Sequence, residues 1–218
     1  MTKEIGMKNL IHLTFGEELG NSIAHGVMSV LLLFILPAVA IYSYNKGGIL
    51  LAAGTSVFVI CLFLMFLTST LYHAMSYDTP HKYVLRILDH IFIYFAIAGS
   101  YTPIALYAIG GWQGWLVLII QWSMVLFGGL YKSIAQKSVP KLSVLIYLVM
   151  GWTAVFFLPT LIHNTTPLFI GLIILGGLLY TVGAFFYMQK SRPYFHFIWH
   201  VFINLAALTH FIAIVFYL

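Results

Sequence analysis

Two histidines near the end of the chain, His196 and His200, are four residues apart, and His73 follows Ser69 at the same interval. Residues four apart share one face of a helix, so each pair is placed to act together. Two imidazoles at this spacing can bind one metal ion, and a third histidine from a neighbouring helix would leave a fourth position for water. That arrangement is a catalytic zinc geometry, although imidazole ligands also suit iron, nickel and copper.

A carboxylate and a hydroxyl complete the candidate set. Asp89 could take a proton from such a water, and Ser69 could orient a contact around the metal ligands. Each group also has a simpler explanation, namely an ion pair of Asp89 with Arg86 and a hydrogen bond from Ser69 to a carbonyl one turn back. A histidine pair at this spacing is likewise common on helices that bind no metal. The choice depends on whether the surrounding elements bring these groups together.

The composition excludes a soluble domain as the setting. Of the 218 residues, 62% are hydrophobic and 7% are charged, whereas a soluble domain carries about 25% charged residues. The net charge of +5 is therefore expected to set the membrane topology and not to bind nucleic acid. The single cysteine, Cys61, lies in an apolar stretch and allows no intrachain disulfide.

Seven apolar stretches follow one another, each near the roughly 20 residues that a helical span needs. They cover residues 22–44, 49–74, 88–108, 112–131, 142–162, 167–188 and 195–217. The breaks between them carry glycine, proline or charge, as at Gly47-Gly48 and Gly110-Gly111. We therefore predict an all-α membrane protein, a seven-transmembrane helix bundle that sits as a multi-pass protein in the cell membrane.

Basic residues are distributed unevenly over the expected loops. The side of the N-terminus holds Lys3, Lys8, Lys82, Arg86, Lys132, Lys137, Lys141, Lys190 and Arg192. The other side holds only Lys46, so the positive-inside rule predicts a cytoplasmic N-terminus and an external C-terminus. Residues 1–21 are expected to form a cytoplasmic interfacial segment, with a helix over 5–20, and residues 22–218 a single seven-span membrane domain.

This topology brings the candidate groups to one depth, at the cytoplasmic ends of four spans. The groups are His25, His73, Asp89, His90, His196 and His200. Ionisable side chains are costly inside a membrane, so their concentration at one level predicts a functional site.

Three motifs occur in order along the chain: Glu18, Asn21 and His25; Ser69, His73 and Asp89; and His196, His200 and His210. With these motifs, essentially the whole chain resembles the hemolysin III proteins. These form the bacterial branch of the progestin and adipoQ receptor family, which includes the adiponectin receptors. One departure is Ala24, because the eukaryotic receptors usually have serine or threonine just before the histidine of the first motif.

The resemblance implies a zinc ion held by His73, His196 and His200, with Asp89 meeting the water at the metal. It also implies a link to the membrane-embedded ceramidases, which share this arrangement. His210 would lie about 15 Å deeper than His200, too far for a ligand, so we expect it to form a hydrogen bond between helices.

The first motif has two interpretations. Glu18, Asn21 and His25 lie at i, i+3 and i+7, so one helical face could present all three behind the metal ligands. Alternatively, they form a helix cap and headgroup contacts at the start of the first span.

Three functions remain open at this point. The first is a zinc-dependent hydrolase of ceramidase type that cleaves an acyl-lipid amide, with a membrane lipid as its substrate, and influences membrane lipid homeostasis. The second is a cytolysin or pore of the hemolysin III type, which the spans disfavour because they are polar at one end only. The third is a non-catalytic membrane receptor or regulator stabilised by zinc.

Overall fold

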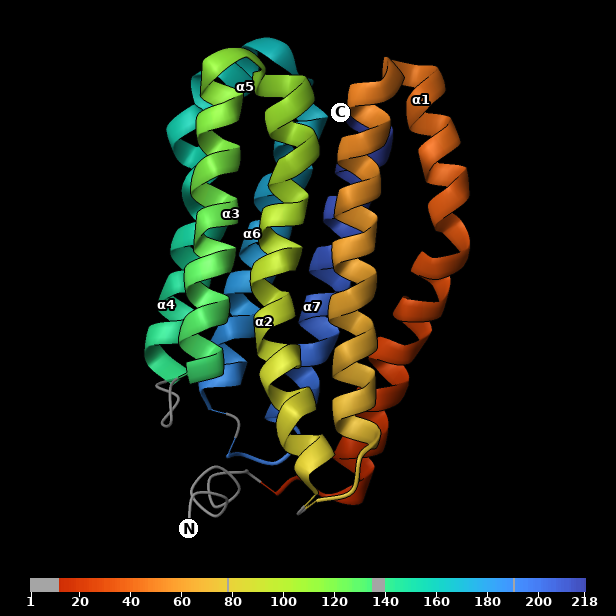
Figure 1. Ribbon diagram of the computed structural model, residues 1–218, viewed down its shortest axis with the longest axis vertical. Helices are drawn as coiled ribbons and strands as arrows, with labels where there is room; N and C mark the ends of the chain where they lie inside the picture. Colours follow the sequence, from red (N-terminus) through yellow and green to blue (C-terminus); the bar gives the residue numbers. More distant parts are fainter. Residues whose placement is uncertain (1–11, 78, 135–139, 190) are drawn as a thin grey trace.

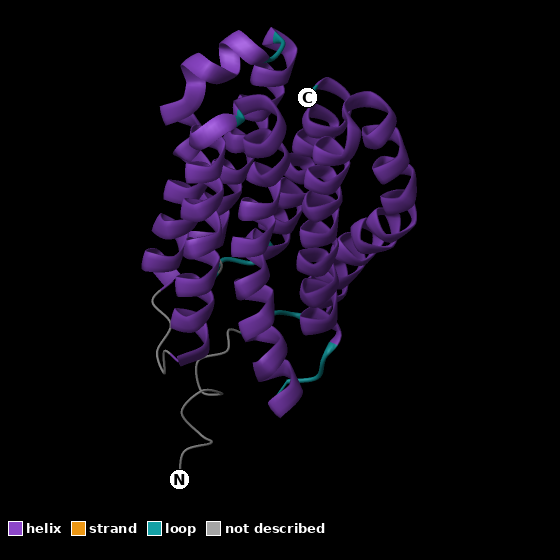
Figure 2. Ribbon diagram, turned by 45° about the horizontal axis from the view of Figure 1, so that its top comes forward, coloured by secondary structure: helices purple, strands orange, loops and turns teal. Residues whose placement is uncertain are grey.

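The computed structural model of the protein describes residues 12–77, 79–134, 140–189 and 191–218. Within these residues every regular element is a helix, and the helices run alongside one another in a bundle (Figures 1 and 2). Six helices of the described chain are long and apolar enough to cross a membrane. The predicted all-α class is therefore confirmed.

The first helix contains two of the expected spans. Helix α1 covers Phe15–Ala74, 60 residues, which if straight would extend about 90 Å, three times the hydrocarbon thickness of a bilayer. The chain instead turns back at Gly47 and Gly48, where the backbone leaves the helical conformation. Gly48 has φ 69° and ψ −162°, a conformation that residues with a side chain rarely adopt. Figure 1 shows the two arms side by side, and the break at Gly47-Gly48 lies where the sequence predicts it.

A capping box starts the first arm of α1. The Thr14 hydroxyl accepts a hydrogen bond from the backbone of Glu17, and the Glu17 carboxylate accepts one from the backbone of Thr14. Because this cap starts the helix at Phe15, residues 15–21 belong to the same helix as the first expected span. The boundary expected at residue 22 therefore falls within α1. Residues 5–11 and the topology lysines Lys3, Lys8, Lys137 and Lys190 lie outside the described residues.

Proline and threonine start several of the remaining helices. Thr79 caps α2 and Thr166 caps α6, each followed by a proline at the first helical position, where its missing N–H costs nothing. The elements after α1 are α2 (Pro80–Pro103), the π-helical segment η2 (Ile104–Ile109), α3 (Gly111–Ile134), α4 (Pro140–Gly151), the 3₁₀ segment η3 (Trp152–Phe157), α5 (Leu158–Asn164), α6 (Pro167–Met188), α7 (Phe195–Ile212) and the π-helical segment η4 (Ala213–Tyr217).

Small residues let the inner helices approach closely. A Cβ atom at Gly54 of α1 would lie 2.7 Å from the Cα of Pro103, and one at Gly128 of α3 would lie 2.6 Å from the ring of Tyr94. Outward faces are apolar and exposed, and in the most apolar windows of the helix over Lys141–Asn164 and of α6 only 11% and 17% of residues are buried. Such surfaces suit contact with lipid tails.

Several helices start at the same end of the bundle. The start of α1, the start of α2 and the start of α7 lie together there, whereas the C-terminus, Leu218, lies at the opposite end (Figure 1). At that opposite end Lys46 donates to the carbonyl of Phe216 at 2.9 Å. The candidate site is at the first end.

Candidate metal centre

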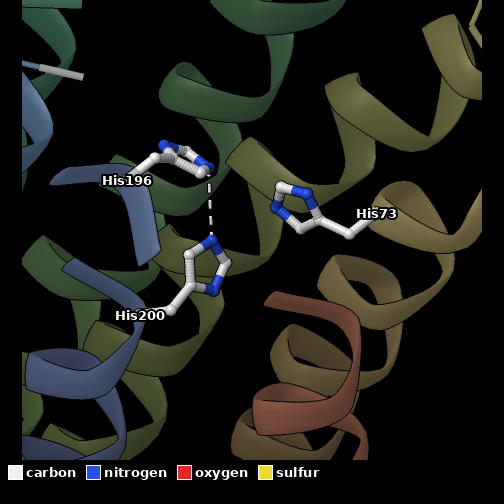
Figure 3. A group of neighbouring side chains, drawn as sticks. All are labelled: His73, His196 and His200. Atoms are coloured by element: carbon white, nitrogen blue, oxygen red, sulfur yellow. Dashed lines mark hydrogen bonds between the residues drawn. The ribbon is translucent and has the colours of Figure 1, made fainter. Parts of the chain in front are cut away.

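Three histidines from two distant parts of the chain face one another. His73 is in the last turn of α1, and His196 and His200 lie one turn apart near the start of α7 (Figure 3). One nitrogen of each ring lies within 4.8 Å of the other two, and the Nε2 atoms of His196 and His200 are 3.2 Å apart. The structure therefore brings together the three histidines that the sequence singled out.

A hydrogen bond orients the ring of His73 and leaves its second nitrogen without a partner among the described residues. Its Nδ1 donates to the carboxylate of Glu18, on the other arm of α1. Its Nε2 is buried and has no hydrogen-bond partner among the described residues. A carboxylate behind Nδ1 fixes the tautomer and orientation that leave Nε2 for a metal ion.

The ring of His200 is held in a similar way. It is fully buried, and its Nδ1 lies 2.9 Å from Nε2 of His25, which is also buried. When Nδ1 of His200 donates to His25, Nε2 of His200 is left with a lone pair toward His196. Glu18 and His25, two members of the first motif, thus contact two of the three candidate ligands.

The donor set fits a metal ion. Imidazole nitrogens at about 2.0–2.1 Å from a tetrahedral zinc ion stand about 3.3 Å apart, close to the 3.2 Å between His196 and His200. The unpartnered Nε2 of His73 is buried, and a buried acceptor without a partner is costly unless something binds to it. Three neutral nitrogens from three rings are a ligand set typical of zinc, and the fourth position would stay open.

Glu18 is the centre of a wider network. Its Oε1 accepts from the Nζ of Lys82 at 2.8 Å and from the hydroxyl of Tyr77. Burial, followed by the hydrogen bond to Glu18, raises the pKa of the Tyr77 phenol, so this group remains a neutral donor at physiological pH. Sequence reasoning missed Lys82, although it lies seven residues before Asp89 and therefore on the same face of α2.

Asp89 lies at the edge of the histidine cluster. Its side chain is buried, and it shares with His196 the wall of a small pocket. One carboxylate oxygen is 3.7 Å from Nδ1 of His90, a ring that donates from this nitrogen to the carbonyl of Arg86. Asp89 and one candidate ligand, His196, thus line the same pocket.

Ser69 and Asn21 carry buried polar atoms with no hydrogen-bond partner among the described residues. The hydroxyls of Thr68 and Thr70, on either side of Ser69, each donate to a carbonyl one turn back. Ser69 makes no such bond, so the simpler explanation for its hydroxyl does not apply here. Asn21 is fully buried one turn from both Glu18 and His25. His210, in contrast, donates to the carbonyl of Ile173 on α6 at 3.2 Å, which confirms the expected bond between helices.

A cavity of about 280 Å³ extends from these groups into the bundle. His25, Ser69 and Asp89 line one end, and apolar residues of α2, α4, α5 and α6 line most of the remaining wall. Along α2 and into the start of η2 the lining runs from Asp89 to Ile104, about 22 Å at 1.5 Å per residue. The polar groups of the site therefore meet a long apolar space.

A bundle of apolar helices around a buried cluster of histidines defines the class of the protein, a multi-pass membrane protein with a candidate metal centre. The sequence profile of the family described as "Haemolysin-III related" matches residues 13–211. The chain belongs to this family, as its motifs predict.

Individual relatives agree with this assignment. Hemolysin-3 homolog of Bacillus subtilis (strain 168) is 35% identical over 204 residues, which cover 94% of this chain and 95% of that protein. Hemolysin-3 of Bacillus cereus is 34% identical over 201 residues, 92% of this chain and 91% of that protein. Monocyte to macrophage differentiation factor of Homo sapiens is 30% identical over 156 residues, 69% of this chain and 64% of that protein.

Proposed function

We propose that the protein is a zinc-dependent membrane hydrolase that cleaves the amide bond of an acyl lipid. One observation carries the proposal: His73, His196 and His200 converge within 4.8 Å, and His25, which contacts His200, lines a mostly apolar cavity together with Ser69 and Asp89. A metal-ligand set, a carboxylate and an apolar space in one place match the needs of lipid hydrolysis.

The residues of the site divide the chemistry among them. A zinc ion held by His73, His196 and His200 would polarise the amide carbonyl and lower the pKa of a water molecule toward about 7. Asp89 takes the proton of the attacking water and passes it to the leaving amine. Ser69, with its unpartnered hydroxyl in the same cavity wall, donates to the carbonyl oxygen as that oxygen gains charge.

The apolar lining of the cavity favours a substrate that is recognised by its acyl chain. Most of the cavity wall is apolar, with a few polar side chains such as Ser100 and Thr181 among the apolar ones, and Ser69 and Asp89 also line it. An amide carbonyl at the polar end would place its acyl chain in the apolar part, which burial of hydrocarbon stabilises. Substrate and product would exchange with the surrounding bilayer.

We further propose that the chain crosses the membrane seven times with its N-terminus in the cytoplasm. The hairpin of α1 supplies two crossings, and the ends of the described chain lie at opposite ends of the bundle, as an odd number requires. Single cysteines placed at Lys46 and Lys141 in a Cys61→Ser background test this orientation. Only the cysteine at position 46 should react with an impermeant reagent in intact cells, and the reverse result would overturn it.

The metal content of the purified protein tests the central proposal. Wild type should hold one zinc ion per chain, and His196→Ala should lose it. His163→Ala is the matched control, because this histidine is exposed and far from α7 in sequence. Asp89→Asn should keep the metal but lose hydrolysis of acyl-amide lipids reconstituted with the protein. A protein without zinc, or an Asp89→Asn variant with full turnover, would refute the proposal.

The names of the two Bacillus relatives, Hemolysin-3 homolog and Hemolysin-3, favour a cytolysin as a second candidate. A membrane pore would require polar groups along several spans, whereas the cavity among the described helices is lined mostly by apolar residues. Dye release from liposomes that contain the purified protein distinguishes the two functions. Release that persists in the His196→Ala variant would favour the cytolysin.

A further inference from the structure

Lys82 is a charged side chain with no exposed surface. Its Nζ donates to Oε1 of Glu18 at 2.8 Å and to the carbonyl of Met75 at 3.0 Å. The ammonium also lies 4.0 Å from the ring centre of Tyr77 and 4.9 Å from that of Tyr72. A buried lysine is costly unless it is paired, so this set of contacts explains why the position tolerates one.

Lys82 and Tyr77 donate to the same oxygen of the Glu18 carboxylate. Oε1 of Glu18 receives both Lys82 and the Tyr77 hydroxyl, whereas Oε2 receives Nδ1 of His73. Two donors on one oxygen fix the rotation of the carboxylate, and this rotation directs the other oxygen at the histidine. The orientation of His73 therefore depends on groups that do not touch it.

Removal of the ammonium would release this arrangement. A buried carboxylate that has lost its ammonium partner is drawn toward water, even with Tyr77 and His73 still donating to it. Glu18 lies in the first turn of α1, at the end of the helix. Once the carboxylate turns away, His73 has no acceptor at Nδ1 and its ring is free to change tautomer. The nitrogen that faces His196 and His200 is then no longer held as an acceptor.

We propose that Lys82 is a positioning residue for the three-histidine site, acting through Glu18 to hold His73 ready for a metal ion. The proposal rests on the proposed function only in requiring that these histidines bind a divalent metal. It needs no lipid turnover. A merely structural lysine, which anchors the turn between α1 and α2 through Met75, is the alternative that the experiment must separate.

Binding of Co²⁺ to the metal-free protein in detergent provides the test, because the visible absorption of tetrahedral Co²⁺ reports the site directly. Wild type should bind one ion. Lys82→Met and Glu18→Gln should each weaken binding about 10- to 100-fold, the range typical of partners behind metal ligands. The double variant should be no weaker than the worse single variant, because both changes break one connection. Lys46→Met, which removes a lysine at the other end of the bundle, should bind as wild type.

Each outcome has a defined meaning. Wild-type affinity in Lys82→Met, or losses that add up in the double variant, would overturn the role of Lys82 while leaving the metal site intact. A wild-type protein that binds no Co²⁺ would overturn both proposals. If Lys82→Met does not fold, Tyr77→Phe removes the other donor from the same oxygen. That variant should weaken binding several-fold, and unchanged binding would overturn the proposal.

Discussion

Nδ1 of His200 and Nε2 of His25 lie 2.9 Å apart, and both rings are buried. His25 lies on the first arm of α1 and His200 on α7, 175 residues later. Together with the bond from His73 to Glu18, this contact gives the first turns of α1 a defined part in the site. They supply none of the three candidate ligands and still contact two of them.

His25→Ala should therefore weaken metal binding without removing a ligand. Loss of the ring frees the tautomer of His200, so we expect about a 10- to 100-fold lower affinity for Zn²⁺. His200→Ala should abolish stoichiometric binding. Competition with a chelator on the purified protein measures both affinities, with His163→Ala as the exposed-histidine control. Equal affinities of His25→Ala and wild type would show that the contact has no role in metal binding.

The sequence predicted the part of the site that follows local rules. Spacing of four residues placed His196 and His200 on one helical face, and the span pattern brought His73 to the same level. The break at Gly47-Gly48 was also visible, because glycine pairs interrupt apolar helices. The role of the three histidines as metal ligands stays a prediction.

The rest depends on tertiary contacts that no local pattern encodes. Lys82 was expected in a loop, as one of several charges that set the topology, yet it is buried against Glu18, 64 residues earlier in the chain. Glu17 was not singled out either, and its partner Tyr194 is 177 residues away. Such pairs form only when the start of α1 packs beside the starts of α2 and α7.

Glu17→Ala should destabilise the protein by about 1–2 kcal/mol. The substitution removes the acceptor of the capping box at Thr14 and the acceptor of the backbone N–H of Tyr194, which precedes α7. Glu17→Gln keeps a side-chain oxygen in the same place and should lose less. Thermal unfolding in detergent compares the variants, and an Ala variant as stable as wild type would contradict the assignment.

Filling the cavity should block lipid binding and leave the metal site intact. Ala184 of α6 lines the cavity, so Ala184→Phe places a ring in the proposed path of the acyl chain. We expect about a 10-fold or greater loss of affinity for a fluorescent acyl-amide lipid, about 1.4 kcal/mol per tenfold, because the ring takes space that the acyl chain would otherwise fill. Ala53→Phe adds the same ring to an exposed position of α1 and should bind lipid as wild type. An Ala184→Phe variant that binds lipid normally would mean that the acyl chain lies elsewhere.

A pair of glycine substitutions tests the close contact between the second arm of α1 and the end of α2. A methyl group at Gly54 would lie 2.7 Å from the backbone Cα of Pro103, which cannot move aside as a side-chain end can. Gly54→Ala should therefore cost about 1–3 kcal/mol of stability. Gly171→Ala, in α6, meets no atom within 4 Å and should stabilise the protein by about 0.5–1 kcal/mol, since alanine favours the helix. The thermal unfolding midpoints of both variants and of wild type, measured in the same detergent, test this prediction. If the two substitutions shifted the midpoint equally, helix propensity alone would explain them, and the close approach of α1 to α2 at Gly54 would not contribute to stability.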